Sequence, residues 1–179
     1  MDSSRTYRFI PADVYTAGYR IVGKIMASTN GIMGTLNDTT KSYLEIHDGR
    51  LARIHMPSKL VDHFEVVRLV KPKVVVVCVA RREDLGPTNI VRGGYSNIIE
   101  TPAHLATDVF EIEGKLPVAG RFNFATMITE KTRNFIPMFD VTLTAILLPN
   151  LKVQSPGILF NREKVDLLAF ISQRAKEDR

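Results

Sequence analysis

The sequence of 179 residues has no tryptophan and a single cysteine, Cys78. One cysteine excludes an intramolecular disulfide and is typical of a reducing compartment. No apolar run reaches the ~18 residues that a membrane-spanning helix needs. The opening residues, MDSSRTYRF, lack the basic segment and apolar stretch of a signal peptide. We therefore expect a cytoplasmic protein with no membrane partner.

Recognisable signatures of chemistry are missing as well. The sequence has no Gly-x-Ser-x-Gly elbow, no Ser-x-x-Lys pair and no complete phosphate-binding loop. His47, His55 and His63 recur at a spacing of eight, but Asp48-Gly49 and Pro57 interrupt any strand that would align them. The sequence therefore predicts a non-enzymatic protein without a cofactor or a metal site.

Positive charge is in moderate excess. The net charge is +5 and the pI is about 9.4, which suits an anionic partner without requiring one. The alternative interpretation is a solvated surface with local clusters of charge. The candidate residues for binding nucleic acid or another anion are Lys24, Lys115, Arg68, Lys71, Lys73, Arg81, Arg82, Arg92, Arg162 and Lys164.

An internal repeat is the strongest signal in the sequence. The segment FEIEGKL at 110–116 repeats YRIVGKI at 19–25 in register, at an offset of 91 residues (110 − 19). With one inserted residue, the same alignment places YLEIHD at 43–48 on FIPMFD at 135–140. A spacing that holds over such a length predicts a duplicated unit.

The predicted fold class is mainly β, with two tandem small β-barrel-like domains that each carry a short helix or loop insertion. A glycine in the middle of the first strand of each repeat, Gly23 or Gly114, predicts a bulge. A polar pair before the last strand, Lys71-Pro72 or Arg162-Glu163, predicts a tight hairpin. The expected boundaries are an N-terminal arm at 1–16, a first repeat at 17–84, a linker at 85–107 and a second repeat at 108–179 that ends in a basic tail.

The second repeat resembles a family of uncharacterised bacterial small domains. The resemblance is carried by GRFNFATMITEKTRNFIPMFDVTL and GILFNREKVDLLAF, with a Gly-Arg-apolar start to a helical turn, a Phe-Ile-Pro strand and an Asn-basic turn. The first repeat departs from this pattern, with Tyr43-Leu44-Glu45 and VKPKV at the corresponding places. No activity is established for that family, so the resemblance implies an architecture and no chemistry.

Both repeats are also similar to Sm-like barrels, five-stranded domains that form RNA-binding rings. Gly23 and Gly114 stand mid-strand as a glycine does in the first Sm motif, and Arg92-Gly93 is similar to the Arg-Gly pair of the second. The Arg-Gly segment, however, follows the complete first repeat and has no equivalent in the second. The similarity implies RNA binding, and this departure puts that implication in doubt.

Three functions are therefore open. We favour a binding or assembly protein that forms a homo-oligomer through its strand edges. The alternative is nucleic-acid binding through the basic hairpins of both repeats, with Tyr43 or Tyr95 available for base stacking. The second alternative is an enzyme with a site between the repeats, built from the carboxylates Asp48, Asp108, Glu111, Glu113 and Asp140.

Overall fold

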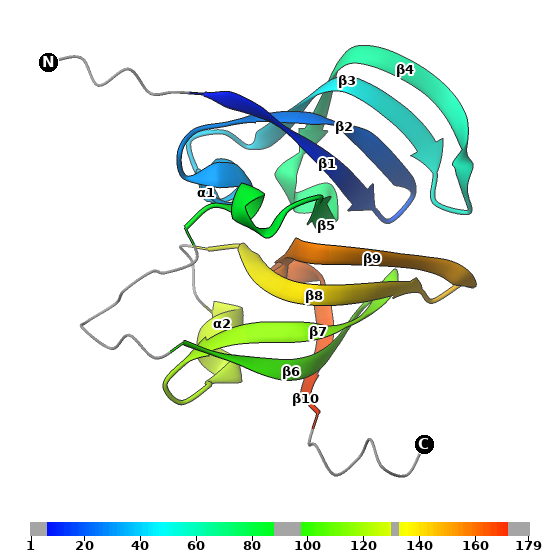
Figure 1. Ribbon diagram of the computed structural model, residues 1–179. Coiled ribbons are helices and arrows are strands. Elements are labelled where there is room, and N and C mark those ends of the chain that lie inside the picture. Colours follow the sequence, from blue (N-terminus) through cyan, green and yellow to red (C-terminus); the bar gives the residue numbers. More distant parts are fainter. Residues whose placement is uncertain (1–6, 88–97, 130–132, 172–179) are drawn as a thin grey trace, which may run out of the picture.

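The computed structural model describes residues 7–87, 98–129 and 133–171 and has a mainly β fold (Figure 1). The elements of the first half are β1 (Arg8–Thr16), β2 (Tyr19–Ala27), α1 (Gly31–Asn37), β3 (Tyr43–Arg53), β4 (Met56–Val70), η1 (Lys71–Lys73), β5 (Val74–Val79) and η2 (Arg82–Leu85). Those of the second half are β6 (Ile98–Thr107), β7 (Phe110–Ala119), α2 (Phe124–Thr129), β8 (Phe135–Ala145), β9 (Leu148–Asn161), η3 (Arg162–Lys164) and β10 (Val165–Phe170).

All ten strands belong to one antiparallel sheet, in the order β10-β6-β7-β8-β9-β5-β1-β2-β3-β4. Within the described residues the sheet does not close, so β10 and β4 are its two edges. The mainly β class is therefore confirmed, whereas two separate closed barrels are not found. Figure 1 shows β1 to β4 on one side of the molecule and β6 to β8 on the other, with β5 and β9 between them.

The two halves share one strand order. It is β5-β1-β2-β3-β4 in the first half and β10-β6-β7-β8-β9 in the second. The first hairpin of each half is held by the same contact: the Tyr19 amide donates to Thr16 Oγ1 at 2.9 Å, and the Phe110 amide donates to Thr107 Oγ1 at 2.9 Å. The halves are joined by pairing between β9 and β5.

Strands form part of the predicted N-terminal arm and part of the predicted linker, whose residues 1–6 and 88–97 lie outside the described residues. Residues 8–16 form β1, which pairs on both sides, with β2 and β5. Residues 98–107 form its counterpart β6, which pairs with β7 and β10. The two strands share a Pro-Ala pair at the repeat's own offset of 91 (102 − 11), a signal too short to stand out in the sequence.

The predicted tight hairpins before the last strands are wrong. Among the described strands, β4 pairs with β3, whereas β5 pairs with β1 and β9. The 3₁₀ turn η1, with Pro72 at its start, carries the chain across the half, so that β5 joins the opposite end of the strand order. The turn η3 does the same between β9 and β10.

The predicted bulges are confirmed. The β2–β3 register shifts at Gly23, and the β7–β8 register shifts at Gly114. A Cβ atom at Gly23 would lie 2.7 Å from the His47 carbonyl oxygen, and one at Gly114 would lie 2.8 Å from the Phe139 carbonyl oxygen. Glycine is required at both places because the neighbouring backbone comes too close for a side chain.

Two hydrophobic cores lie on either side of the β5–β9 pair, and both strands supply both cores. Val77 and Leu159 belong to the core of the first half, whereas Cys78 and Ile158 belong to the core of the second. This division follows from the alternation of side chains along a strand. The β5–β9 junction is therefore a wall common to both cores.

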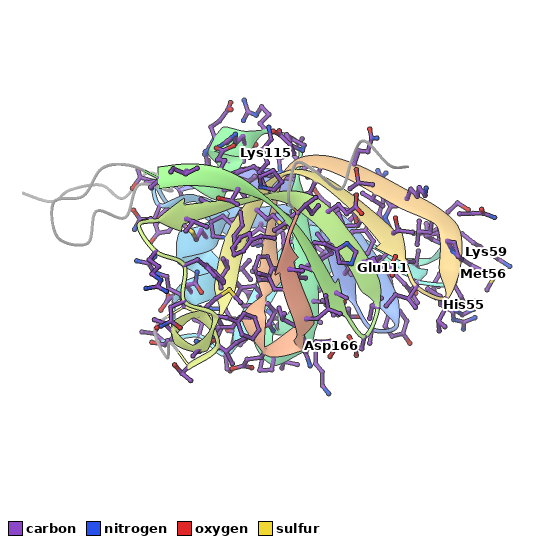
Figure 2. The ribbon with its side chains drawn as sticks, turned by 90° about the horizontal axis from the view of Figure 1, so that it is seen from below. His55, Met56, Lys59, Glu111, Lys115 and Asp166 are labelled. Atoms are coloured by element: carbon purple, nitrogen blue, oxygen red, sulfur yellow. The ribbon has the colours of Figure 1, made fainter. Side chains whose placement is uncertain are left out.

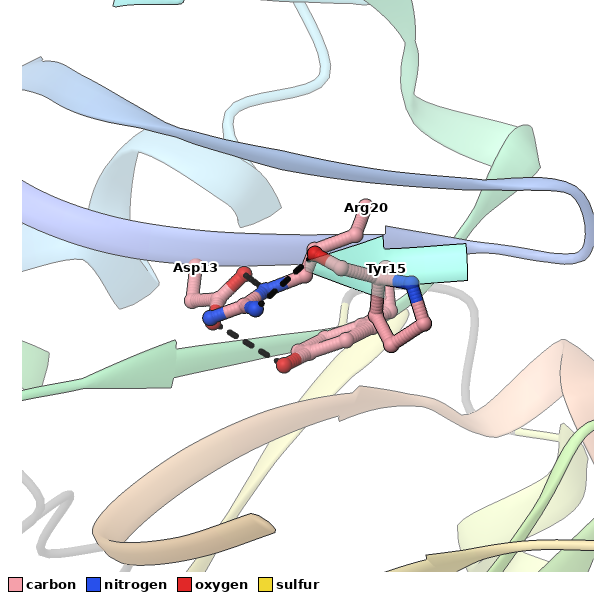
Figure 3. Close-up of polar contacts among 4 residues, drawn as sticks. Asp13, Tyr15 and Arg20 are labelled. Atoms are coloured by element: carbon pink, nitrogen blue, oxygen red, sulfur yellow. Dashed lines mark hydrogen bonds and ion pairs between the residues drawn. The ribbon is translucent and has the colours of Figure 1, made fainter. Parts of the chain in front are cut away.

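Tyr15 reaches across this wall from β1 into the second core. Its ring is fully buried and packs edge-on against Phe110, with ring centroids 5.3 Å apart. Its hydroxyl donates to Asp13 Oδ2 at 2.9 Å, and Arg20 Nη2 donates to the same oxygen at 2.7 Å (Figure 3). Burial, followed by the charge of Asp13, raises the pKa of Tyr15, so the phenol stays neutral and acts as a hydrogen-bond donor.

Two substitutions of Tyr15 distinguish the contribution of its ring to stability from that of its hydroxyl. We expect Tyr15→Ala to lower the free energy of unfolding by about 3–5 kcal/mol because a buried aromatic ring is lost. Tyr15→Phe should cost about 1 kcal/mol because one hydrogen bond is lost. Urea denaturation measures both, with the half-exposed Tyr7→Ala as the control. Equal costs for the two Tyr15 variants would contradict the packing role.

Candidate functional site

The two lysines of the repeated Gly-Lys motif are held in matching ion pairs. Lys24 Nζ donates to Asp48 Oδ2 at 2.8 Å, and Lys115 Nζ donates to Asp140 Oδ2 at 2.7 Å. Both aspartates have positive φ, 51° and 49°, at the bulge opposite the glycine. The lysine hydrogen bond lowers the pKa of each carboxyl. Each lysine charge is thus balanced locally, which favours a structural role over a common anion-binding groove.

The cations Lys71 and Arg162 occupy matching buried positions at the start of η1 and η3. Lys71 Nζ donates to the Thr35 and Asp38 carbonyl oxygens, at 2.8 and 2.6 Å, where α1 ends. Arg162 Nη1 donates to the Met127 and Ile128 carbonyl oxygens, at 3.2 and 3.3 Å, in α2. Their exposed fractions are 8% and 6%. Each cation therefore ties the helical segment of its half to the turn before the last strand.

Arg81 and Arg82 lie beyond the other end of β5, away from Lys71. Arg81 Nη2 bonds the buried Asp84 at 3.1 Å, and Arg8 bonds the same carboxylate from β1 at 3.0 Å. Arg82 pairs with Glu100 of β6 and lies over the Phe139 ring, 3.6 Å from its centroid. These contacts attach the η2 segment to the first strand of each half.

The remaining basic candidates are Arg68, Lys73, Lys164 and Arg92. Arg68 is exposed on β4 and pairs with Glu45 at 3.1 Å. Lys73 and Lys164 line one pocket, described below, whereas Arg92 lies outside the described residues. The proposed stacking residue Tyr43 is half-buried, and Tyr95 also lies outside the described residues. Whether any of these residues binds nucleic acid stays a prediction.

Groups capable of chemistry are scattered. Burial raises the pKa of the Cys78 thiol, which disfavours the reactive thiolate. Figure 2 shows His55, Met56 and Lys59 together at the tip of the β3–β4 hairpin, apart from Lys115. In the described part of the chain, no group of three or more His, Cys, Asp or Glu residues is placed to hold a metal ion. No helix there has the length and apolar character needed to cross a membrane.

A pocket of about 200 Å³ lies where the two halves meet, between the end of α1, η1 and the start of β8. Its titratable residues include Asp38 and Lys71. Hydrogen bonds from Thr40 lower the pKa of Asp38, and burial lowers that of Lys71. A general acid at neutral pH needs a carboxyl whose pKa is raised. The pKa of Asp38 is displaced in the opposite direction, and Lys71 Nζ is already bonded to the Thr35 and Asp38 carbonyl oxygens.

We compared the chain with family models, curated proteins and solved structures. None of the three comparisons found a significant match.

The two edge strands of the sheet are less buried than the equivalent strands at the β5–β9 junction. We call Val66–Val70 the β4 edge and Val165–Phe170 the β10 edge. At the internal junction, every residue of β5 is buried and so is every residue of β9 from 157 to 161. At the edges none of the matching residues is buried, and Val70, Leu167 and Phe170 are 49%, 47% and 40% exposed. The sequence indicated edges in general, but identifying these two required the strand order.

The buried cations should matter for stability. We expect Lys71→Met and Arg162→Met each to lower the free energy of unfolding by about 1–3 kcal/mol, because each change leaves helix carbonyl oxygens without their donor. Lys73→Met and Lys164→Met are the matched controls, since they remove a charge from the same turns without removing a bond to a helix. Urea denaturation provides the measurement. Unchanged stability of Lys71→Met and Arg162→Met would instead leave these cations available for a ligand.

The paired aspartates should titrate below their ordinary range. Because their folded-state pKa values are lowered, the two ion pairs stabilise the fold above about pH 4, and this contribution is lost as the pH falls through those values. The Lys24→Met/Lys115→Met double variant should raise both pKa values towards the ordinary one. An NMR titration of the side-chain carboxyl carbons measures this, with Lys59→Met as the control. Identical titration curves in the double variant and the parent would show that the pairs do not form in solution.

Proposed function

We propose that this protein is a non-enzymatic assembly module that associates with further copies of itself through the β4 edge and the β10 edge. The observation that carries the proposal is the difference in burial described above. The same strand positions are buried where β5 meets β9 and are uncovered at the two ends of the sheet. An unpaired strand with apolar side chains is a template for pairing with another chain.

The distribution of charge along β4 supports this choice of surface. Natural edge strands are commonly protected by charged residues. The outer part of β4 carries Lys59, Asp62 and Glu65, whereas the β4 edge carries a single charge, Arg68. The β10 edge carries Asp166 alone, at a bulge in its pairing with β6. The least protected stretch of β4 is therefore the one whose counterpart is buried in the internal junction.

Each half is best described, on this proposal, as one small barrel-like unit of a duplicated chain. The common strand order, the matching threonine contacts and the matching buried cations support the duplication. One core per half supports the barrel-like description. Membership of the bacterial small-domain family and similarity to Sm-like barrels stay predictions and contribute nothing to this argument.

Nucleic-acid binding is the alternative function, and the purified protein used to measure assembly also tests it. Several of the basic candidates have local partners in the fold, since Lys24, Lys115 and Arg68 bond carboxylates and Lys71 bonds carbonyl oxygens. An assembly that binds through its remaining cations would lose the ligand at high salt. The protein has five tyrosines and no tryptophan, so co-purified nucleic acid would dominate the absorbance at 260 nm.

Light scattering coupled to size exclusion tests the proposal. We expect a mass that is a multiple of 20.1 kDa at micromolar concentration and that falls in Leu167→Lys/Phe170→Lys, because a charge on each exposed apolar position opposes burial of the β10 edge. Leu147→Lys, in the exposed β8–β9 turn, is the matched control. A monomer at all accessible concentrations would contradict the proposal, and absorbance at 260 nm that salt removes would favour the nucleic-acid alternative.

A further inference from the structure

We infer that the β4 edge of one copy pairs with the β10 edge of the next in the register of the internal β9–β5 junction, so that copies associate head to tail. The inference rests on the proposed function. It adds that the β4 edge meets the β10 edge and gives the register in which their residues pair. Because β9 and β4 hold the same place in their halves, as do β5 and β10, the internal junction is a template for a contact between copies.

The strand registers define the correspondence. Leu69 pairs with Leu44 in the first half as Phe160 pairs with Ile136 in the second, so the β4 edge matches 157–161 of β9. On the other side, Val76 pairs with Tyr15 as Leu167 pairs with Ala106. Next to the Val76–Tyr15 pair and next to the Leu167–Ala106 pair, the register shifts by one residue. The two strand pairs therefore match in the position of their bulge as well.

The internal junction then gives the register between copies. Inside the chain, Val76 pairs with Phe160, Val77 with Leu159, Cys78 with Ile158 and Val79 with Gly157. Replacing each residue by its counterpart gives the predicted pairs between neighbouring copies. These pairs are Leu167 with Leu69, Leu168 with Arg68, Ala169 with Val67, and Phe170 with Val66.

A mainly apolar open pocket marks the place where the next copy would pack, although Lys73, Asp108 and Lys164 also line it. It has a volume of about 500 Å³, and its lining includes Tyr19, Ile21, Leu51, Val67 and Leu69. The counterparts of these five in the second half are Phe110, Ile112, Leu143, Ile158 and Phe160, all buried in the second core.

Residues of the first half complete that second core. Tyr15, Val76 and Cys78 belong to it and come from β1 and β5. In the contact between copies, the corresponding residues would be Ala106, Leu167 and Ala169 of the neighbour. The exposure of one pair of counterparts shows the difference, since Phe110 is 0% exposed and Tyr19 is 46% exposed.

Association through β4 and β10 also explains both edges at once. A two-fold dimer that joined β4 to β4 would leave the apolar residues of β10 uncovered, and a dimer through β10 would leave those of β4 uncovered. A head-to-tail contact covers one edge of each kind at every junction. Such a heterologous contact continues from copy to copy until it closes into a ring or extends as a filament.

Two positions carry a charge that the template lacks. Asp166 stands where the internal junction has the buried Val75. Arg68 stands where the internal junction has the buried Leu159. Covering its guanidinium has a desolvation cost that a leucine does not have. The contact between copies should therefore be weaker than the internal one, and Arg68→Leu should strengthen it.

Disulfide trapping tests the register. In the double variant Val67→Cys/Ala169→Cys, the two new thiols belong to opposite edges of one chain and meet only across a junction between copies. Directly paired strand residues lie within the distance that a disulfide spans. We expect mild oxidation to give a ladder of covalent oligomers from this variant. Each single variant should give none, and the parent, with its buried Cys78, should also stay monomeric under denaturing electrophoresis.

The controls distinguish failure of the register from failure of assembly. Glu65→Cys/Ala169→Cys lies two residues out of register on the same strands and should cross-link at least tenfold more slowly. A Val67→Cys single variant that forms covalent dimers would show β4–β4 pairing, which overturns this inference and leaves assembly through edges standing. Light scattering that shows only monomers, for the parent and for Arg68→Leu, would overturn both. An Arg68→Leu variant that associates at tenfold lower concentration would support the register.

Discussion

The pairing of β5 with β9 is the contact on which the rest of the molecule depends. It joins the two halves into one sheet, and its alternating side chains complete both hydrophobic cores. A strand buried on both faces reads as a continuous apolar run, and this is why β5 has the sequence VVVVCV. Tyr15 also links the two halves, because it comes from the first half and its ring packs in the core of the second. Neither half therefore has a complete core without the other.

Charge in this fold is used mainly to fasten turns. Lys71 and Arg162 have different side chains but play the same structural role, because each donates hydrogen bonds to carbonyl oxygens of the helix in its half. The Lys24 and Lys115 pairs likewise hold the aspartates of the two bulges. A basic pI calculated from composition does not distinguish cations that are bonded within the fold from those available to a ligand. The geometry does, because it shows a partner within the fold for most of the basic candidates in the described residues.

The sequence predicted the periodic and chemically specific features and missed the long-range ones. Strand alternation and the repeated Gly-Lys motif predicted the β class and both bulges correctly. The partner of β5 could not be predicted, because a run of valines suits any buried position, and η1 was interpreted as a hairpin because Lys71-Pro72 looks like a turn between neighbours. The strands β1 and β6 were missed because tertiary pairing, rather than similar sequence, makes them equivalent. Strand order is a property of contacts far apart in the chain, and local patterns do not encode it.

The differences between the internal junction and the two edges follow from what each must do. The internal junction forms once, during folding, and can be wholly apolar because it is never exposed in the folded state. On the proposed assembly, an edge must remain soluble until another copy arrives, and Arg68 and Asp166 would supply the charge for this in place of Leu159 and Val75. A fully apolar edge would associate without regard to register or partner. On the same proposal, a few charges on an otherwise matching strand would instead give a contact that is weaker than the internal one and therefore reversible.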